Sequence, residues 1–464
     1  MADHAHIEPV TGASEKERSY GVDEALVRAC NAAMDEGRME AVDVLIADLH
    51  ASDLADLLEE LAGENRRKLL DHVRDQLDPE LLTHMDDVVR EDMLELLEPE
   101  EVAAVLTELE TDDALDVFED IAEADQQDVL EHLSPSDRAL LEQALTYPED
   151  SAGRLMQREV VMAPEHWTVG DAVDFLRAAK RLPDQFYHVT LVDPKLRPLA
   201  NVTLGKLMSS GRNVPLLDIV EEVFCVIPAL QDEADVAYAF NQYHLISAPV
   251  VDESNRLIGM ITIDDAMAVL EEESQEDILR LAGVTESNLS DRVLETAKQR
   301  FPWLAVNLVS AILASLVIAQ FEATIAQLVA LAVLMPIVAS MGGNAGTQSL
   351  TVAVRALATR DLTASNMWRV VRREVVVGLL NGLLFAAVMG VVGFVWFGSI
   401  ALGGVIAAAM VVNLIVAGLS GTLVPIVLDR FGVDPALASG AFVTTVTDVV
   451  GFFAFLGLAA WVLL

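Results

Sequence analysis

The chain has 464 residues and a formal net charge of −43 at pH 7. The charge is divided near residue 300: the first 300 residues contain 67 acidic and 24 basic side chains, and the remainder contains six of each, with no lysine or histidine. Such an acidic chain is excluded as a nucleic-acid binder because it would be repelled by phosphate. Two cysteines, Cys30 and Cys225, exclude a disulfide framework. An acidic, soluble front is therefore joined to an apolar tail typical of a membrane domain.

The first part of the chain predicts a short tail followed by a helical repeat. Residues 1–40 are expected to form a partly disordered N-terminal tail. Residues 1–25 lack the apolar core of a signal peptide, so we expect the front to stay in the cytoplasm. Residues 41–146 contain apolar residues that recur at a spacing of twelve, behind polar helix-capping residues. The repeating segments begin at Ala51, Gly63, Pro99, Thr111, Glu123 and Pro135. Helices this short are not stable alone, which predicts an all-α superhelical N-terminal domain.

Residues 147–271 change to mixed α+β character. From Ala248 to Leu270 the pattern predicts a strand, a polar turn, a strand and a helix. A weaker copy precedes it at an offset of 59 residues, which aligns Asp193 with Asp252. We therefore expect a tandem α+β repeat.

The next segment, 272–300, predicts one amphipathic connecting helix between the soluble front and the tail. Its helical part runs from Ser274 to Arg300, and its apolar side consists of Ile278, Leu281, Leu289, Val293 and Ala297.

The tail, residues 301–464, predicts five transmembrane helices, each near or above the ~20 residues that cross a bilayer. The apolar stretches are 302–321, 324–353, 375–397, 400–428 and 436–464. The loop after the second carries five arginines, from Arg355 to Arg373, and such an excess marks the cytoplasmic side. We therefore expect a multi-pass protein of the cell membrane with the soluble front in the cytoplasm and the C-terminus outside.

One acid of the tail stands out from the other five. Asp448 lies inside the last apolar stretch, whereas we place the others, Glu374 among them, at boundaries or in loops. A carboxylate near the bilayer centre costs about 3 kcal/mol on insertion scales, so it indicates an ion ligand or a proton carrier. The alternative is an Asp that is hydrogen-bonded to a neighbouring helix for packing.

The second apolar stretch contains a helix-breaking motif, Met335 to Ser349. Pro336 and three glycines predict an interrupted helix whose freed carbonyls line a cavity, together with the side chains of Asn344, Thr347 and Gln348. The alternative is close helix packing through Gly342 and Gly346, which form a GxxxG pair.

The available ligands limit the ion. Neither His nor Cys occurs after residue 250, so the tail offers only oxygen ligands, which suit hard cations. Mg²⁺ keeps much of its water and is held by one or two carboxylates, and a homodimer would supply two from a single Asp per chain. We expect no enzyme, because an intramembrane aspartyl hydrolase needs a second carboxylate at depth.

Together these segments resemble the MgtE family of magnesium channels and transporters over nearly the whole chain. The matching motifs are YPEDSAGRLM (147–156), the two CBS-like copies, EEESQEDILRLAGV (271–284), PIVASMGGNAGTQS (336–349) and DPALASGAFVTTVTDVVGF (434–452). The resemblance implies a homodimeric Mg²⁺-selective channel that imports Mg²⁺ and is closed by Mg²⁺ binding between its cytosolic domains. It also implies that segment 272–300 acts as a plug helix.

The resemblance carries over to individual positions. It implies that Asp448 holds the hydrated ion, with Asn344, Gln348, Thr444 and Gly451 around it. The implied cytosolic metal-sensing acids are Asp232, Asp265, Glu273, Glu276, Asp277 and Asp434. Thr262 and Asp265 match the position where CBS domains often hold a ribose, which implies ATP or another adenine nucleotide.

Two other functions remain open from sequence. One is an ion- or proton-coupled divalent cation exchanger in which Asp448 titrates. The other is a membrane-anchored sensor that passes a nucleotide-binding signal from the CBS-like pair to a partner.

Most of the 67 acids are expected to be solvated surface that keeps the protein soluble in concentrated salt.

Overall fold

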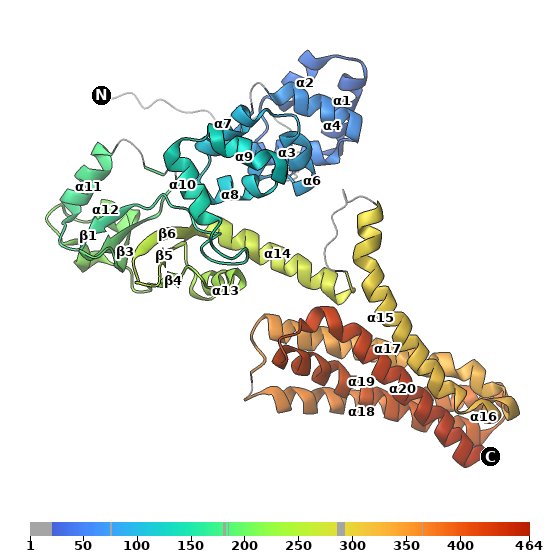
Figure 1. Cartoon of the computed structure of the whole chain (residues 1–464). Helices are drawn as coiled ribbons and strands as arrows, with labels where there is room; N and C mark the ends of the chain where they lie inside the picture. The colour runs from blue at the N-terminus through green and yellow to red at the C-terminus, as the bar shows by residue number, and fades with distance from the viewer. Residues whose placement is uncertain (1–20, 75–76, 180–181, 184, 285–292, 364) are drawn as a thin grey trace, which may run out of the picture. The chain divides into compact units, whose positions relative to one another are not determined.

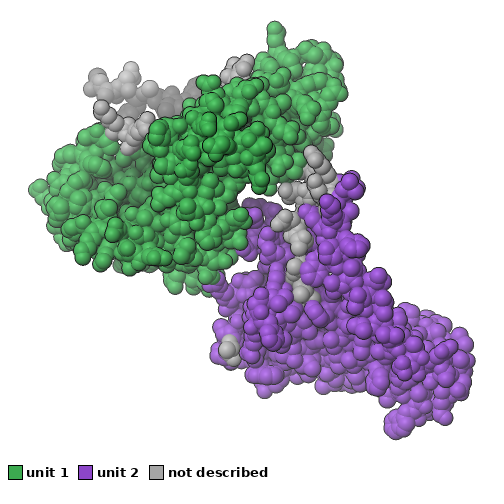
Figure 2. Space-filling view, in the orientation of Figure 1, with its two compact units in different colours: residues 1–270 green, residues 271–464 purple. Residues whose placement is uncertain are grey.

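The computed structural model describes residues 21–74, 77–179, 182–183, 185–284, 293–363 and 365–464. The chain divides into two compact units, residues 1–270 and 271–464 (Figure 2). We describe each unit by itself.

Short helices make up the first half of unit 1 (Figure 1). They are α1 Glu24–Asp35, α2 Met39–Ile46, α3 Ala51–Glu60, α4 Gly63–Val73, α5 Pro79–Thr83, α6 Asp87–Leu94, α7 Pro99–Glu108, α8 Thr111–Glu119, α9 Glu123–His132 and α10 Pro135–Ala144. The six repeat segments predicted from sequence begin at the first residues of α3, α4, α7, α8, α9 and α10. Their apolar faces form one continuous core that includes Leu57, Leu58 and Phe118. The predicted all-α N-terminal domain is confirmed.

The predicted boundary of the N-terminal tail at residue 40 is wrong. Helix α1 begins at Glu24, because the side chain of Asp23 accepts a hydrogen bond from the backbone of Ala25 and caps it. Cys30 and Met34 are buried in the same core as the repeat helices. The folded N-terminal domain therefore includes residues that we had assigned to the tail.

A buried arginine ties two of these helices together. The guanidinium of Arg90, on α6, lies 2.6 Å from a carboxylate oxygen of Asp116 and 2.5 Å from one of Asp120. The Arg90 side chain is only 5% exposed, so the carboxylates offset the cost of burying its charge. This contact holds α6 against the C-terminal end of α8.

Two copies of a small α+β motif follow. The first contains β1 Met162–Pro164, α11 Val169–Ala178, β2 His188–Val192, β3 Pro198–Thr203, α12 Leu204–Ser209 and the 3₁₀ helix η2 Leu216–Ile219. The second contains β4 Ile227–Pro228, α13 Glu233–Tyr243, β5 Ser247–Val251, β6 Leu257–Thr262 and the start of α14 Ile263–Leu281. In each copy the first two strands are parallel and the last two antiparallel.

The internal repeat predicted at an offset of 59 residues is confirmed in detail. Strands β2 and β3 recur at this offset as β5 and β6. The β2–β3 and β5–β6 turns place Leu196 and Asn255, also 59 apart, at positive φ. Equivalent residues of the two copies even touch, since His188 Nδ1 lies 2.6 Å from the hydroxyl of Ser247.

The prediction of one connecting helix over 274–300 is wrong. Helix α14 continues from the second α+β copy only to Leu281, and the chain then turns at Gly283, whose φ is +75°. A left-handed residue of this kind ends a helix, and glycine adopts it without a steric penalty. The next helix begins at Val293, while residues 285–292, with the predicted apolar Leu289, lie outside the described residues.

The described residues of unit 2 include five helices long and apolar enough to cross a membrane, as the sequence predicted. They lie in α15 Val293–Ala319, α17 Ala330–Ala358, α18 Met367–Phe397, α19 Ile400–Arg430 and α20 Pro435–Leu463. The second of them starts later than expected, because residues from Glu322 to Gln327 form a separate short helix, α16.

The helix-breaking motif does not break its helix. Helix α17 runs without interruption through Pro336 and the glycines, so the expected interrupted helix is wrong. Instead, Gly342 and Gly346 are buried where neighbouring helices approach closely. A Cβ at Gly342 would lie 2.2 Å from Nδ2 of Asn413, and one at Gly346 would lie 2.7 Å from a methyl of Val443. This observation supports the packing alternative for the glycine pair.

Candidate functional site

Asp448 lies at the middle of α20. It is the fourteenth residue of a helix that runs from Pro435 to Leu463, 29 residues in all. Its side chain is half-buried, and within the described part of the chain its carboxylate has no hydrogen-bond or ion-pair partner. The packing alternative required such a partner on a neighbouring helix. An unpaired carboxylate at membrane depth is the feature expected of an ion site.

A polar stripe runs along one side of α17. Five uncharged polar residues on this helix are exposed, and we call them the α17 polar face: Ser340, Asn344, Thr347, Gln348 and Thr351. They recur at intervals of three and four residues, so they share one side of the helix. The hydroxyl groups of Thr347 and Thr351 donate to carbonyls of their own helix, at 3.0 Å each, which leaves hydroxyl lone pairs available outward. A polar face on a membrane-spanning helix is costly against lipid and indicates a second polar surface or water opposite it.

The other residues expected near Asp448 differ from one another in their exposure and their contacts. Thr444 is exposed, one turn before Asp448, and its hydroxyl donates to the carbonyl of Gly440 at 2.9 Å. Gly451 is buried and packs against Asn413, so its small size serves a helix contact. Among the described residues, no direct hydrogen bond joins Asn344 to Asp448, since the amide of Asn344 donates to Ser340 instead.

Sequence reasoning missed Asn413. This residue of α19 is fully buried, and its amide nitrogen donates to the backbone carbonyl of Val338 at 2.8 Å. Its Oδ1 is buried, and no group in the described part of the chain forms a hydrogen bond with it. A single Asn within a strongly apolar stretch was the available signal, because amides at membrane depth are rare.

Glu374, which we place at the boundary of the third apolar stretch, is buried in the structure. It is 7% exposed and is the eighth residue of α18. Its carboxylate accepts a hydrogen bond from Ser349 at 3.0 Å. Glu374 is thus a second buried acid of the membrane domain, with a partner on α17.

Three of the predicted sensing acids meet at the end of α14. Glu276 pairs with Arg280, and Nε of Arg280 lies 3.4 Å from a carboxylate oxygen of Asp434. Burial, and then the negative charge of Asp434, raises the pKa of Asp277 above its usual value. Asp434 also caps α20, since it accepts a hydrogen bond from the backbone of Ala436 at 2.7 Å. Arg280, which the sequence did not single out, therefore holds this group of acids together.

Asp265 belongs to a second group of acids, in unit 1. Its carboxylate accepts hydrogen bonds from the hydroxyl and the backbone N–H of Thr262, at 2.5 and 3.2 Å, so the pair caps the start of α14. Burial, with nearby Asp264, raises the pKa of Asp265 to about 6 despite these bonds. The predicted nucleotide contacts, Thr262 and Asp265, are thus hydrogen-bonded to each other.

Sequence reasoning missed the partners of Asp265. Three acids at the start of α8, which we call the α8 acids, are Glu110, Asp112 and Asp113. Burial, then the charge of Glu159, raises the pKa of Glu110 to about 7. Burial, then the charge of Asp265, raises the pKa of Asp113 to about 6 and that of Asp112 well above its usual value. These side chains were indistinguishable by sequence from the many solvated acids around them.

The remaining predicted sensing acids take separate positions. Asp232 caps α13, where its carboxylate accepts from the backbone of Asp235 at 3.4 Å. Glu273 lies on α14, one turn before Asp277. Within the described residues, no group of three or more His, Cys, Asp or Glu side chains is arranged to hold a bare metal ion.

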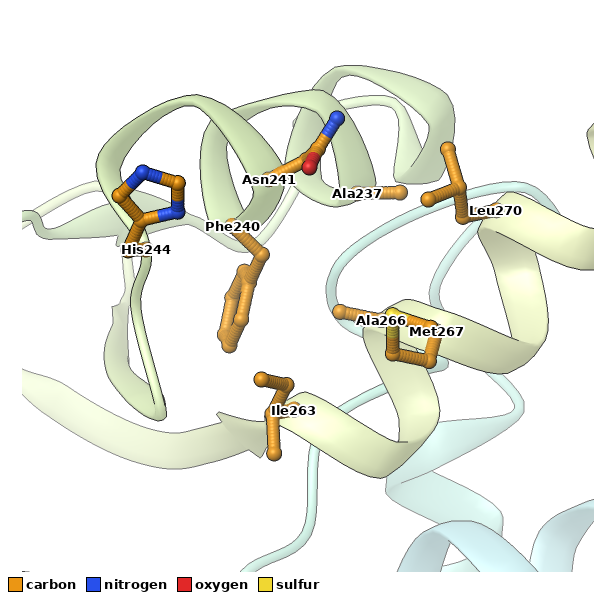
Figure 3. Close-up of a pocket in the computed structure, with 8 residues that line it drawn as sticks. All are labelled: Ala237, Phe240, Asn241, His244, Ile263, Ala266, Met267 and Leu270. Atoms are coloured by element: carbon orange, nitrogen blue, oxygen red, sulfur yellow. The ribbon is translucent and has the colours of Figure 1, made fainter.

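A pocket in the second α+β copy lies between α13 and the start of α14 (Figure 3). Figure 3 shows Phe240, Ile263, Ala266 and Met267 facing it, with Asn241 and His244 on the α13 side. The lining is mostly apolar, and neither Thr262 nor Asp265 belongs to it. The adenine nucleotide therefore stays a prediction.

Comparisons with known proteins agree with this architecture. Family models match at residues 335–458 (MgtE, a divalent cation transporter), 49–150 (the MgtE intracellular N domain) and 220–272 (a CBS domain). The magnesium transporter MgtE of Bacillus subtilis is 32% identical over 316 residues, which cover 68% of this chain and 70% of that protein. The magnesium transporter MgtE of Thermus thermophilus is 35% identical over 329 residues, covering 69% of this chain and 72% of that protein.

A solved structure, described as the cytosolic domain of the Mg²⁺ channel MgtE in complex with ATP, is also similar. It is 30% identical and covers 52% of this chain and 99% of its own, with a TM-score of 0.48. The three matched regions lie in the N-terminal helices, the α+β copies and the membrane helices, in the order expected from sequence. The chain belongs to the MgtE family of transporters.

Proposed function

We propose that this protein is a Mg²⁺ channel of the cell membrane that imports Mg²⁺ and is closed by Mg²⁺ bound to its cytosolic acids. The observation that carries the transport function is the carboxylate of Asp448 at the centre of α20, which no described residue pairs with. A carboxylate at this depth is stabilised when a cation and its water occupy the passage beside it. The relatives' name, magnesium transporter, agrees with the oxygen-only ligands of the membrane domain.

The pathway is proposed to lie where two copies of the chain meet. The α17 polar face is exposed in a single chain, as is Thr444 one turn from Asp448. A two-fold axis beside these groups would bring together two Asp448 carboxylates and two Asn344 amides around one hydrated ion. Mg²⁺ parts with its water reluctantly, so ligands that bond to its hydration shell suit it.

Gating is proposed to use the two groups of acids that α14 connects. Asp265, at the start of α14, interacts with the α8 acids, and Asp277, near its end, interacts with Asp434. The negative charge of Asp265 contributes to the raised pKa of Asp112 and Asp113, and that of Asp434 contributes to the raised pKa of Asp277, so the carboxylates of each group repel when they are ionised. Bound Mg²⁺ would cancel this repulsion and favour the closed state, so import stops when the cytosol is replete.

The proposed topology follows from the arginine-rich loop between α17 and α18. Arg360, Arg369 and their neighbours favour a cytoplasmic position for this loop, and we propose that both acid groups lie on the same side. With five spans, the C-terminus is then outside. Mg²⁺ arriving from outside therefore passes Asp448 before it reaches the sensing acids.

The deciding experiment measures Mg²⁺ uptake by vesicles that contain the purified protein. Asp448→Asn keeps the size of the side chain but removes its charge, and we expect uptake to fall to the level of empty vesicles. Asp429→Asn, an exposed acid at the end of α19, is the matched control and should keep wild-type uptake. Wild-type uptake in Asp448→Asn would refute the assignment, and uptake that follows an imposed pH gradient rather than voltage would favour a coupled exchanger.

A further inference from the structure

Asn413 is a fully enclosed polar side chain of the membrane domain that the transport mechanism does not yet use. It lies on α19 with none of its surface exposed. Its Nδ2 donates to the carbonyl of Val338 on α17, at 2.8 Å, whereas its Oδ1 has no hydrogen-bond partner among the residues that the structure describes. An unpartnered acceptor at membrane depth is costly, so packing alone does not explain an Asn at this position.

Two glycines make room for this amide from opposite helices. A Cβ on Gly342 of α17 would lie 2.2 Å from Nδ2, and a Cβ on Gly451 of α20 would lie 2.9 Å from Nδ2 and 3.1 Å from Oδ1. Any other residue at Gly342 would have to displace the amide. The side chain of Asn413 thus occupies a notch formed by α17 and α20, and it joins three helices at one level.

The two notch glycines are close in sequence to the proposed ion-pathway residues. Gly342 precedes Asn344 by two residues on α17, and Gly451 follows Asp448 by three on α20. At a rise of 1.5 Å per residue, the notch lies only about 3 to 5 Å along the helix axes from those groups. The positions of Asn344 and Asp448 along the helix axes, relative to each other, therefore depend on how α17 and α20 fit around Asn413.

Two kinds of contact fix these positions. Contacts such as that between Gly346 and Val443 are non-directional van der Waals contacts between closely packed helices. The hydrogen bond from Asn413 to Val338 is directional, and the notch prevents sliding. We propose that Asn413 is a positioning residue of the ion pathway, which sets the register of α17 and α20 and thereby the selectivity for Mg²⁺ over larger divalent cations. This inference rests on the proposed function of Asp448.

The test measures uptake of Mg²⁺ and Ca²⁺ by vesicles that contain Asn413→Ala or Asn413→Ser, and compares the ratio of the two rates with that of the wild type. We expect the ratio to fall about three- to tenfold in Asn413→Ala, the range that one interhelical hydrogen bond represents. Asn413→Ser keeps a hydroxyl donor with little steric demand, and its ratio should lie between the two. A purely structural role would lower the amount of folded protein and leave the ratio unchanged.

The matched control is Asn381→Ala on α18, an amide in the membrane domain whose side chain is exposed. It should keep the wild-type ratio. If Asn413→Ser and Asn413→Ala both keep the wild-type ratio while Asp448→Asn abolishes uptake, the positioning role is wrong and the transport site stands. Wild-type uptake in Asp448→Asn would instead refute the transport site and, with it, the positioning role of Asn413.

Discussion

Burial among like charges, rather than the helix dipole, controls the protonation of the α8 acids. Glu110, Asp112 and Asp113 lie at the N-terminus of α8, where the dipole favours ionised carboxylates. Their pKa values are nevertheless raised, first by burial and then by neighbouring acids such as Glu159 and Asp265. The protein thus keeps a group of carboxylates that is unfavourable when fully ionised, and a bound cation would relieve this cost.

This protonation predicts that the Mg²⁺ response depends on cytosolic pH. The folded-state pKa values of Glu110, Asp113 and Asp265 are about 7, 6 and 6, above their usual values, so the metal-free fold retains protons between about pH 4 and pH 7. Their contribution to the free energy of unfolding is present at low pH and is lost as the pH rises through this window. Since Mg²⁺ must displace these protons, the Mg²⁺ concentration that half-inhibits uptake should be about tenfold higher at pH 6 than at pH 8.

The measurement uses vesicles in which the pH on the cytosolic side is varied and the outer side is held constant. Asp113→Asn removes one of the titrating groups, and this variant should show a smaller difference between pH 6 and pH 8. A half-inhibiting Mg²⁺ concentration that is equal at both pH values would contradict a role of these acids in sensing.

At the scale of helices, glycine determines how closely α18 and α19 approach. A Cβ on Gly378 would lie 2.4 Å from the carbonyl oxygen of Leu414, and one on Gly418 would lie 2.6 Å from that of Glu374. Both close contacts are to backbone, which cannot rotate away. Since lipid provides no hydrophobic driving force between helices, such close packing is a main source of their association.

Gly378→Ala should therefore destabilise the membrane domain by about 1 to 3 kcal/mol, the usual cost of overpacking. The matched control is Gly404→Ala on α19, where a Cβ would meet no atom within 4 Å. We expect a lower melting temperature in detergent for Gly378→Ala and an unchanged or slightly higher one for the control, because Ala favours helix. Equal melting temperatures for the two variants would show that this contact does not limit the packing.

The helices that sequence could predict are those with both a cap and a repeated apolar pattern. Segments such as Pro99–Glu108 and Pro135–Ala144 have a capping residue, a proline in the first turn and regular apolar spacing, and their first residues were predicted correctly. Helix α5 has only five residues, and α1 lies before the region of twelve-residue spacing, so neither was expected. The turn at Gly283 was also missed, because apolar residues continue at helical spacing on either side of it.

Sequence predicted less of the candidate site than of the fold. Asp448 was identifiable because a charge inside an apolar stretch is rare, and its role as an ion ligand stays a prediction. Asn413 and the α8 acids depend on three-dimensional neighbours: two glycines from other helices in one case, and an acid more than 150 residues away in the other. No local pattern in the sequence encodes either neighbourhood.

At the scale of the whole molecule, α14 is the element that belongs to both units. It begins at Ile263, beside Asp265, and ends at Leu281, just beyond the acids Glu276 and Asp277. The division between the units falls within it, after Leu270. A continuous helix transmits a displacement along its axis with little loss, so binding at one end can bias the other if both favour the same state.

Breaking α14 should consequently separate sensing from transport. Ser274 is exposed at the middle of the helix, and Ser274→Pro removes a backbone donor and adds a steric clash, at a cost of about 3 kcal/mol to the helix. We expect uptake at low cytosolic Mg²⁺ to keep its wild-type rate, because Asp448 and the α17 polar face are untouched, and inhibition by cytosolic Mg²⁺ to weaken several-fold. Ser274→Ala, which preserves the helix, is the control and should keep wild-type inhibition. Normal inhibition in Ser274→Pro would mean that the acids around Asp434 sense Mg²⁺ without help from unit 1. Loss of uptake at all Mg²⁺ concentrations would mean that α14 is needed to open the pathway and not only to close it.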